Sequence, residues 1–134
     1  MLIALAAILG LAIWSEDVVQ AFVQSSGELL RDGFLEDLKE LKLDSDLVLK
    51  LVKPLYGLDD AGDYWARTLV DHHQQDLMMT PTVTDSSLFF LRMEDILIGM
   101  SATYVDDSLR AGTSDFISLS KATRDKFQSK KPSF

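Results

Sequence analysis

The spacing of apolar residues predicts helices and strands in turn along this chain of 134 residues. Residues 2–12 are rich in Leu and Ala, which favour helix, and Gly10 suits the turn that often ends one. Because this helix is apolar on nearly all sides, we expect other protein to cover it. The β-branched and aromatic residues between Ile13 and Val19 predict a strand that ends at Asp17 or just after it.

The middle of the chain has weaker signals. Residues 24–46 are polar and mixed, and their turn signals predict a loop-rich stretch with a short helix near 34–41. Residues 46–53 predict a strand that stops at Pro54, because proline has no amide proton to donate to a sheet.

A longer amphipathic helix follows. Asp59 or Asp60 is suited to cap its first turn, and we expect it to run to about Met78. The positions of its buried stripe recur every three or four residues. They are Ala61, Tyr64, Trp65, Thr68, Leu69 and His72.

Two hairpins are predicted after this helix. Residues 86–92 and 96–105 have the composition of antiparallel strands, joined by a turn at 93–95. The stretch "DDSLRAGT", residues 106–113, predicts a second turn and its return strand.

A final helix begins after Thr113 or Ser114 and is expected to reach about Gln128. Its apolar side carries Phe116, Leu119, Thr123 and Phe127. The order of elements predicts a single α+β domain, in which an antiparallel sheet is backed by helices.

Composition narrows the functions that this fold can serve. The hydrophobic content of 47% is enough for a real core, and the length suits one domain. The formal net charge of -8 argues against a broad basic surface that grips phosphate backbones. The absence of cysteine from the sequence excludes disulfides and cysteine-based zinc sites.

The first 14 residues have the length of the apolar part of a signal peptide. However, no Lys or Arg precedes Arg31, and the stretch is shorter than the ~20 apolar residues that span a bilayer. We therefore expect a buried helix and no stable membrane association. The alternative is a signal or anchor segment in a small secreted or membrane-anchored protein.

Three carboxylates are the candidate chemistry. Asp106 and Asp107 are adjacent, and at ~4 Å such charges repel by ~1 kcal/mol in water and ~4 kcal/mol at an effective dielectric near 20. A bound cation would reverse that cost, whereas the alternative is a solvated turn. If the strand that ends at Asp17 is their neighbour, all three meet at one edge. Mg2+ prefers such oxygen ligands, and two ions ~3.5–4 Å apart can stabilise both oxygens of a phosphoryl displacement.

Three blocks of sequence carry a family resemblance. "YVDD", residues 104–107, resembles the YxDD box of reverse transcriptases, and "DVVQAF", residues 17–22, resembles their first aspartate motif. Between them, "LKLVKPLYGLDDAGDYW" is similar to "LKKSLYGLKQAPRQW" of copia-type (Ty1/copia) retrotransposon polyproteins. The resemblance implies that residues 1–134 are a partial palm domain of a right-hand RNA-directed DNA polymerase.

The resemblance also implies the roles of single residues. Asp17, Asp106 and Asp107 would be the catalytic residues and would bind two Mg2+ ions, for which Mn2+ can substitute. The backbone carbonyl of Val18 would be a further metal ligand. The nucleotide-binding positions would be Phe22 as the steric gate, Tyr56 and Gly57 beside the incoming base, and Tyr104 beneath the primer end.

For a complete enzyme, the partners implied are a primed RNA or DNA template and deoxynucleoside triphosphates, together with the remainder of a Gag-Pol type polyprotein. If the element is expressed, the resemblance implies a location inside the cell, in a cytoplasmic particle or the nucleus. The family's basic fingers segment, its thumb and its RNase H region are not among these residues, so we expect the isolated chain to be inactive. The alternative is a non-catalytic acidic remnant that acts by protein contact or has no function.

Other features favour structural roles. His72 and His73 point about 100 degrees apart on a helix and cannot chelate one ion as a pair. Trp14 and Trp65 are expected to pack in the core. The basic residues in 120–131 suit a solvated helix end, with a nucleic-acid contact as the alternative.

Overall fold

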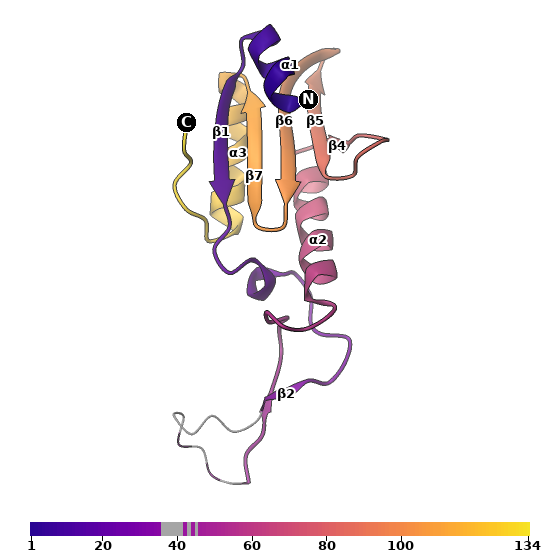
Figure 1. Ribbon diagram of the computed structural model, residues 1–134, viewed down its shortest axis with the longest axis vertical. Helices are drawn as coiled ribbons and strands as arrows, with labels where there is room; N and C mark the ends of the chain where they lie inside the picture. The colour runs from indigo at the N-terminus through magenta and orange to yellow at the C-terminus, as the bar shows by residue number, and fades with distance from the viewer. Residues whose placement is uncertain (36–41, 43, 45) are drawn as a thin grey trace.

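The chain forms an α+β fold in the computed structural model, which describes residues 1–35, 42, 44 and 46–134 (Figure 1). The helices are α1 (Leu2–Leu9), α2 (Ala61–Asp71) and α3 (Ser114–Lys126), with short helical turns η1 (Ala21–Gln24) and η3 (His72–Asp76). The strands are β1 (Ala12–Asp17), β2 (Phe34–Leu35), β3 (Leu49–Lys50), β4 (Thr80–Pro81), β5 (Leu88–Met93), β6 (Ile96–Tyr104) and β7 (Asp107–Gly112).

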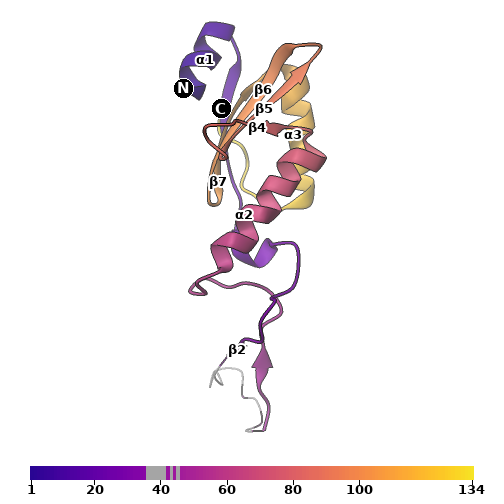
Figure 2. The same cartoon turned by 90° about the vertical axis from the view of Figure 1, so that its right-hand side faces the viewer.

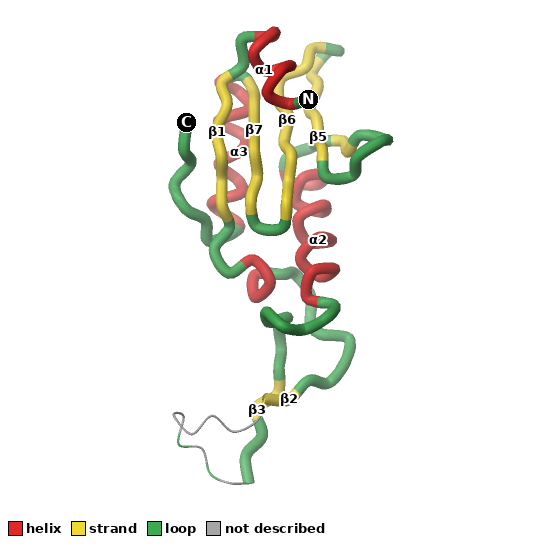
Figure 3. The backbone as a smooth tube through the Cα atoms, in the orientation of Figure 1, coloured by secondary structure: helices red, strands yellow, loops and turns green. Residues whose placement is uncertain are grey.

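Five strands form an antiparallel sheet in the order β1-β7-β6-β5-β4. Both predicted hairpins are confirmed, β5–β6 and β6–β7 (Figure 3). The β5–β6 turn consists of Glu94 and Asp95, both with positive φ, which matches the twist of the flanking strands. The predicted antiparallel α+β class is therefore confirmed.

Helices cover the two faces of the sheet unequally. α2 and α3 lie on one face, and α1 lies on the other (Figure 2). The core between the sheet and the helices α2 and α3 is built around Trp14, Phe89 and Phe116, all buried. Trp65 is also buried, so both tryptophans pack in the core as predicted.

α1 is shorter and more exposed than the sequence suggests. It ends at Leu9, where Gly10 takes the left-handed conformation (φ 65°) that the predicted turn requires. Leu2 and Ala6 pack against the sheet, but Ile8 is 79% exposed. Among the described residues, protein therefore covers α1 on one side only. No helix in the described part of the chain is long and apolar enough to cross a membrane.

The predicted stripe of α2 is buried except at Tyr64, which is half-buried, but the helix changes before Met78. After Asp71 the backbone widens into a π-helical turn, η3, which buries both His72 and His73. Asp60 precedes the first turn without a side-chain capping bond and instead lies 3.0 Å from Arg31. The α-helix therefore ends at Asp71, and the wider turn that follows places two adjacent side chains in the core.

Between β1 and α2 the prediction holds less well. Of residues 46–53 only Leu49–Lys50 forms a strand, β3, and it pairs with β2. β2 contains Phe34 and Leu35, where a helix was expected, and the rest of that expected helix lies outside the described residues. β2 and β3 form a two-stranded sheet of their own, separate from the main sheet (Figure 3).

After α3 the chain turns back along the free edge of β1. Residues 128–133, named here the edge segment, run antiparallel to β1 with bridges Val18↔Ser129 and Ser15↔Ser133. The backbone N–H of Lys130 donates to the carbonyl of Asp17 at 2.9 Å. The edge segment therefore protects the outer hydrogen-bonding groups of β1 (Figure 1).

Candidate functional site

The β6–β7 turn carries two of the candidate carboxylates. Val105 and Asp106 form the turn, and Asp107 is the first residue of β7, opposite Tyr104. Val105 has φ 53°, a conformation that β-branched residues rarely adopt. The indole N–H of Trp65 on α2 donates to the Val105 carbonyl at 2.5 Å, so the strained turn is held by the helix beneath it.

β1 brings the third carboxylate to the same place. Asp17 lies directly opposite Asp107 in the antiparallel register, and cross-strand Cα atoms in such pairs are about 4.5–5.5 Å apart. The N–H of Val18 donates to the carbonyl of Asp106 at 2.9 Å, which ties β1 to the turn. The strand ending at Asp17 is therefore the neighbour of the hairpin, as the convergence of the three carboxylates requires.

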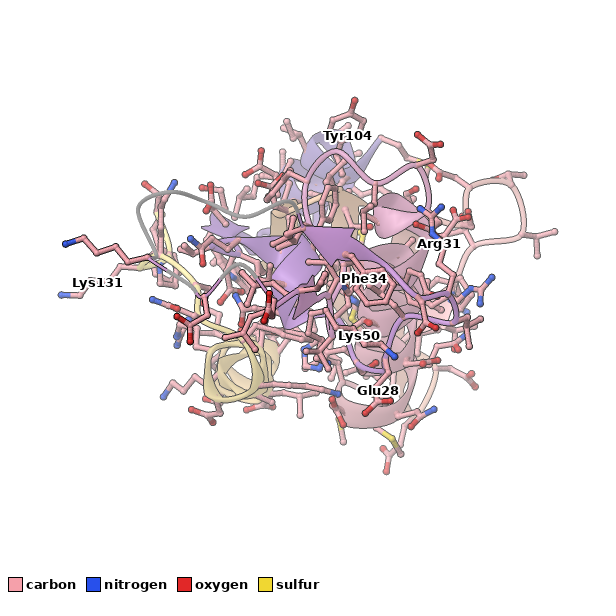
Figure 4. The ribbon with its side chains drawn as sticks, turned by 90° about the horizontal axis from the view of Figure 1, so that it is seen from below. Glu28, Arg31, Phe34, Lys50, Tyr104 and Lys131 are labelled. Carbon is pink, nitrogen blue, oxygen red and sulfur yellow. The ribbon has the colours of Figure 1, made fainter. Side chains whose placement is uncertain are left out.

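The side chains of Asp17 and Asp107 lie on the sheet face opposite α2 and α3, because alternate residues of β1 and β7 point to opposite faces. Glu16, next to Asp17, is buried on the helix side, whereas Asp107 is exposed. The Asp17 side chain is 32% exposed. Tyr104 is 80% exposed, and its ring points away from the body of the molecule (Figure 4).

The three carboxylates are neighbours without forming a finished metal centre. Within the residues that the structure describes, no group of three His, Cys, Asp or Glu side chains is arranged to hold a metal ion. The donor set itself fits Mg2+, which takes a few carboxylate oxygens and keeps several waters. Rotation of the exposed Asp107 side chain is fast and changes the spacing of these oxygens.

A lysine from the edge segment contacts this cluster. Lys130 Nζ lies 3.0 Å from Asp17 Oδ2. This hydrogen bond raises the pKa of the Lys130 ammonium, and the charges of Asp17, Asp107 and Asp106 add to the effect. The sequence indicated only a basic stretch at 120–131, because nothing local shows that this stretch returns to β1.

Of the predicted nucleotide-site residues, Phe22 lies on η1, Tyr56 and Gly57 lie in the loop between β3 and α2, and Tyr104 ends β6. The rings of Phe22 and Tyr56 lie 4.3 Å apart between centroids, with 37° between their planes. Gly57 follows with φ 98°, which favours glycine over any residue with a Cβ. Val18 is buried in the cluster that contains Trp65, so its side chain serves the core.

An open cavity of about 270 Å3 lies beside these residues, between α2 and the end of β6. Phe22, Trp65, Tyr104 and Val105 are among the residues that line it, and Ser87 and Thr103 add hydroxyl groups. Phe22 therefore packs against the Tyr56 ring and also lines the cavity. The cavity has the mainly apolar walls and few polar groups that are typical of small-molecule sites.

Arg124 and Lys126, in the same basic stretch, form ion pairs with acidic residues of this chain. Lys126 Nζ lies 2.6 Å from Asp76 Oδ2, and Arg124 Nη1 lies 3.7 Å from Glu16 Oε1. These pairs favour the structural interpretation of the stretch over a nucleic-acid contact.

His72 and His73 are also structural, as predicted. His72 Nδ1–H donates to Asp76 at 2.7 Å, while Nε2 accepts from the Thr123 hydroxyl at 2.8 Å. Burial lowers the pKa of His72, although the Asp76 carboxylate opposes this shift.

Comparisons of the chain with protein-family models, with curated proteins and with solved structures found no match.

Proposed function

We propose that this chain is a palm fragment of a copia-type reverse transcriptase, whose ancestral reaction is template-directed DNA synthesis from deoxynucleoside triphosphates. The observation that carries the proposal is the pairing of Asp17 with Asp107 on adjacent strands, next to Asp106 in the turn. These residues come from two of the three motifs of the resemblance and are distant in sequence. Their proximity is what a shared cation site requires.

Asp17, Asp106 and Asp107 would hold the cations through their carboxylate oxygens. Two bound Mg2+ ions would activate the primer hydroxyl and neutralise the charge that develops on pyrophosphate. The protein contributes position: β1 presents Asp17, and the Trp65 hydrogen bond at Val105 orients the turn that carries the other two carboxylates.

The aromatic residues support the nucleotide side of the proposal. Phe22, on the helical turn that follows β1, forms a tilted ring pair with Tyr56. The exposed ring of Tyr104 lies at the end of β6. Aromatic faces stack on bases without sequence preference. The cavity beside Phe22 provides mainly apolar walls for such a group.

Divalent-ion binding tests the metal site. We expect the wild-type chain to bind Mn2+, displaceable by Mg2+, in a titration followed by water-proton relaxation. Asp17→Asn and Asp106→Asn should each weaken binding at least about tenfold, because each removes a charged oxygen ligand. Asp95→Asn is the matched control, since Asp95 occupies the other hairpin turn. Equal affinities in all four proteins would contradict the proposal.

Primer extension tests the reaction itself. The wild-type chain and Asp106→Asn are compared on a primed RNA template with deoxynucleoside triphosphates and Mg2+ or Mn2+. Product that depends on Asp106 supports catalysis by this chain. Metal binding without product supports a palm fragment that is inactive alone.

One observation favours the second candidate, an acidic domain that acts by protein contact. α1 exposes Ile3, Ile8 and Leu9, with exposed fractions of 60%, 79% and 50%. Contiguous exposed apolar patches mark interaction surfaces, and these three residues lie on one short helix. Absence of Mn2+ binding together with concentration-dependent self-association, lost in Ile3→Ser/Ile8→Ser, would favour this candidate.

A further inference from the structure

The edge segment fixes Lys130 against Asp17 through both backbone and side chain. The backbone N–H of Lys130 donates to the Asp17 carbonyl at 2.9 Å, and its ammonium lies 3.0 Å from the Asp17 carboxylate. Further along, Ser15 and Ser133 exchange two backbone hydrogen bonds of 2.9 and 3.1 Å. Strand pairing therefore fixes the backbone of Lys130, and the ion pair with Asp17 holds its flexible side chain.

The ammonium also lies within the field of the other two carboxylates. Asp107 and Asp106 both act on Lys130 electrostatically, in addition to Asp17. A divalent cation that used the same Asp17 oxygen would meet a positive charge at hydrogen-bond distance. An ammonium and a divalent cation that share this carboxylate oxygen repel each other.

We propose that the edge segment is an autoinhibitory element, in which Lys130 occupies Asp17 and has to leave before a divalent cation binds the three carboxylates. This inference rests on the proposed function, because it concerns the same carboxylates. The Lys130 side chain can leave without unfolding the segment, since the backbone bonds to β1 do not involve its ammonium.

The exposure of the pair sets the size of the effect. The side chains of Lys130 and Asp17 are 67% and 32% exposed, so water and salt screen their attraction. Removing the lysine charge should therefore tighten divalent binding by roughly two- to fivefold. A deeply buried pair would have a larger effect.

The test is Mn2+ binding by the full chain in wild-type, Lys130→Gln, Lys130→Arg and Lys131→Gln forms. Lys131 is the matched control, because it neighbours Lys130 and extends away from the rest of the molecule (Figure 4). We expect Lys130→Gln to bind Mn2+ more tightly than wild type, and Lys130→Arg and Lys131→Gln to bind it no more tightly than wild type. Circular dichroism during urea unfolding checks that each variant is folded.

The outcomes separate this inference from the proposed function. If Mn2+ binds and depends on Asp17, but Lys130→Gln binds no more tightly than wild type, the autoinhibitory contact is wrong and the metal site stands. If Lys131→Gln gives the same gain as Lys130→Gln, the effect is general charge and the specific contact is wrong. If none of the forms binds Mn2+, both proposals fail.

Discussion

At the scale of single residues, burial decides the charge of His73. Its side chain is completely buried, with Nδ1–H donating to the Leu69 carbonyl at 2.8 Å and Nε2 accepting from the Ser101 hydroxyl at 3.0 Å. Burial lowers the pKa of His73 to about 3, while the hydrogen bond to Leu69 opposes the shift. The folded protein therefore keeps a neutral imidazole where the unfolded chain gains a proton.

This difference predicts a loss of stability on acidification. Below a pH of about 6.5, the ordinary pKa of histidine, His73 binds a proton in the unfolded chain but not in the folded one. The free energy of unfolding therefore falls as the pH decreases from about 6.5 to about 3. Between pH 7 and pH 5, His73 should lower the free energy of unfolding by about 2 kcal/mol. Urea unfolding at the two pH values measures the change.

His73→Gln removes the titrating group at this position. We expect the pH-dependent loss in this variant to be smaller than in wild type by about that amount, whatever its stability at pH 7. An unchanged difference between pH 7 and pH 5 would show that His73 is not the group responsible.

At the scale of elements, α3 packs on the sheet through two glycines. A Cβ at Gly99 on β6 would lie 2.2 Å from the Phe116 ring, and one at Gly112 on β7 would lie 2.4 Å from it. Phe116 is fully buried in the main core, so its ring has little room to move. The two small residues create the space that the ring occupies.

Gly99→Ala should therefore destabilise the protein by about 1–3 kcal/mol through overpacking. Gly62→Ala is the control, because a Cβ there meets nothing within 4 Å and alanine favours the first turn of α2. Urea unfolding of both variants checks the prediction. Equal stabilities for the two variants would mean that α3 shifts without cost.

At the scale of the whole molecule, a buried ion pair joins segments that are far apart in sequence. Glu16 Oε2 on β1 lies 2.7 Å from Arg110 Nη1 on β7, and Arg124 on α3 lies 3.7 Å from the other Glu16 oxygen. Arg110 is completely buried. Burial raises the pKa of the Glu16 carboxyl, and the two arginines partly offset this.

Arg110→Met should cost about 3–5 kcal/mol of stability, because it leaves Glu16 buried without its main partner. Glu16→Met in the same chain should recover most of this loss, since an apolar pair needs no desolvation of charge. Urea unfolding of wild type, both single variants and the double variant completes the cycle. Losses that simply add would show that the pair is not coupled.

Much of the architecture follows from local patterns. The stripe from Ala61 to His72 and the hairpin strands were predictable because a buried face imposes its period on the sequence. The extent of β3 and the π-helical turn at His72 were not, because short pairings and widened turns depend on neighbours distant in sequence.

The same division applies to the candidate site. The sequence determined that Asp17 ends a strand and that Asp106 and Asp107 adjoin a hairpin turn, because these features depend on near neighbours and backbone preference. Only the tertiary structure decided that Asp17 faces Asp107, that Trp65 holds Val105, and that Lys130 returns to Asp17. Each of these contacts closes a long loop of chain, and its partner is set by strand order and packing rather than by local sequence.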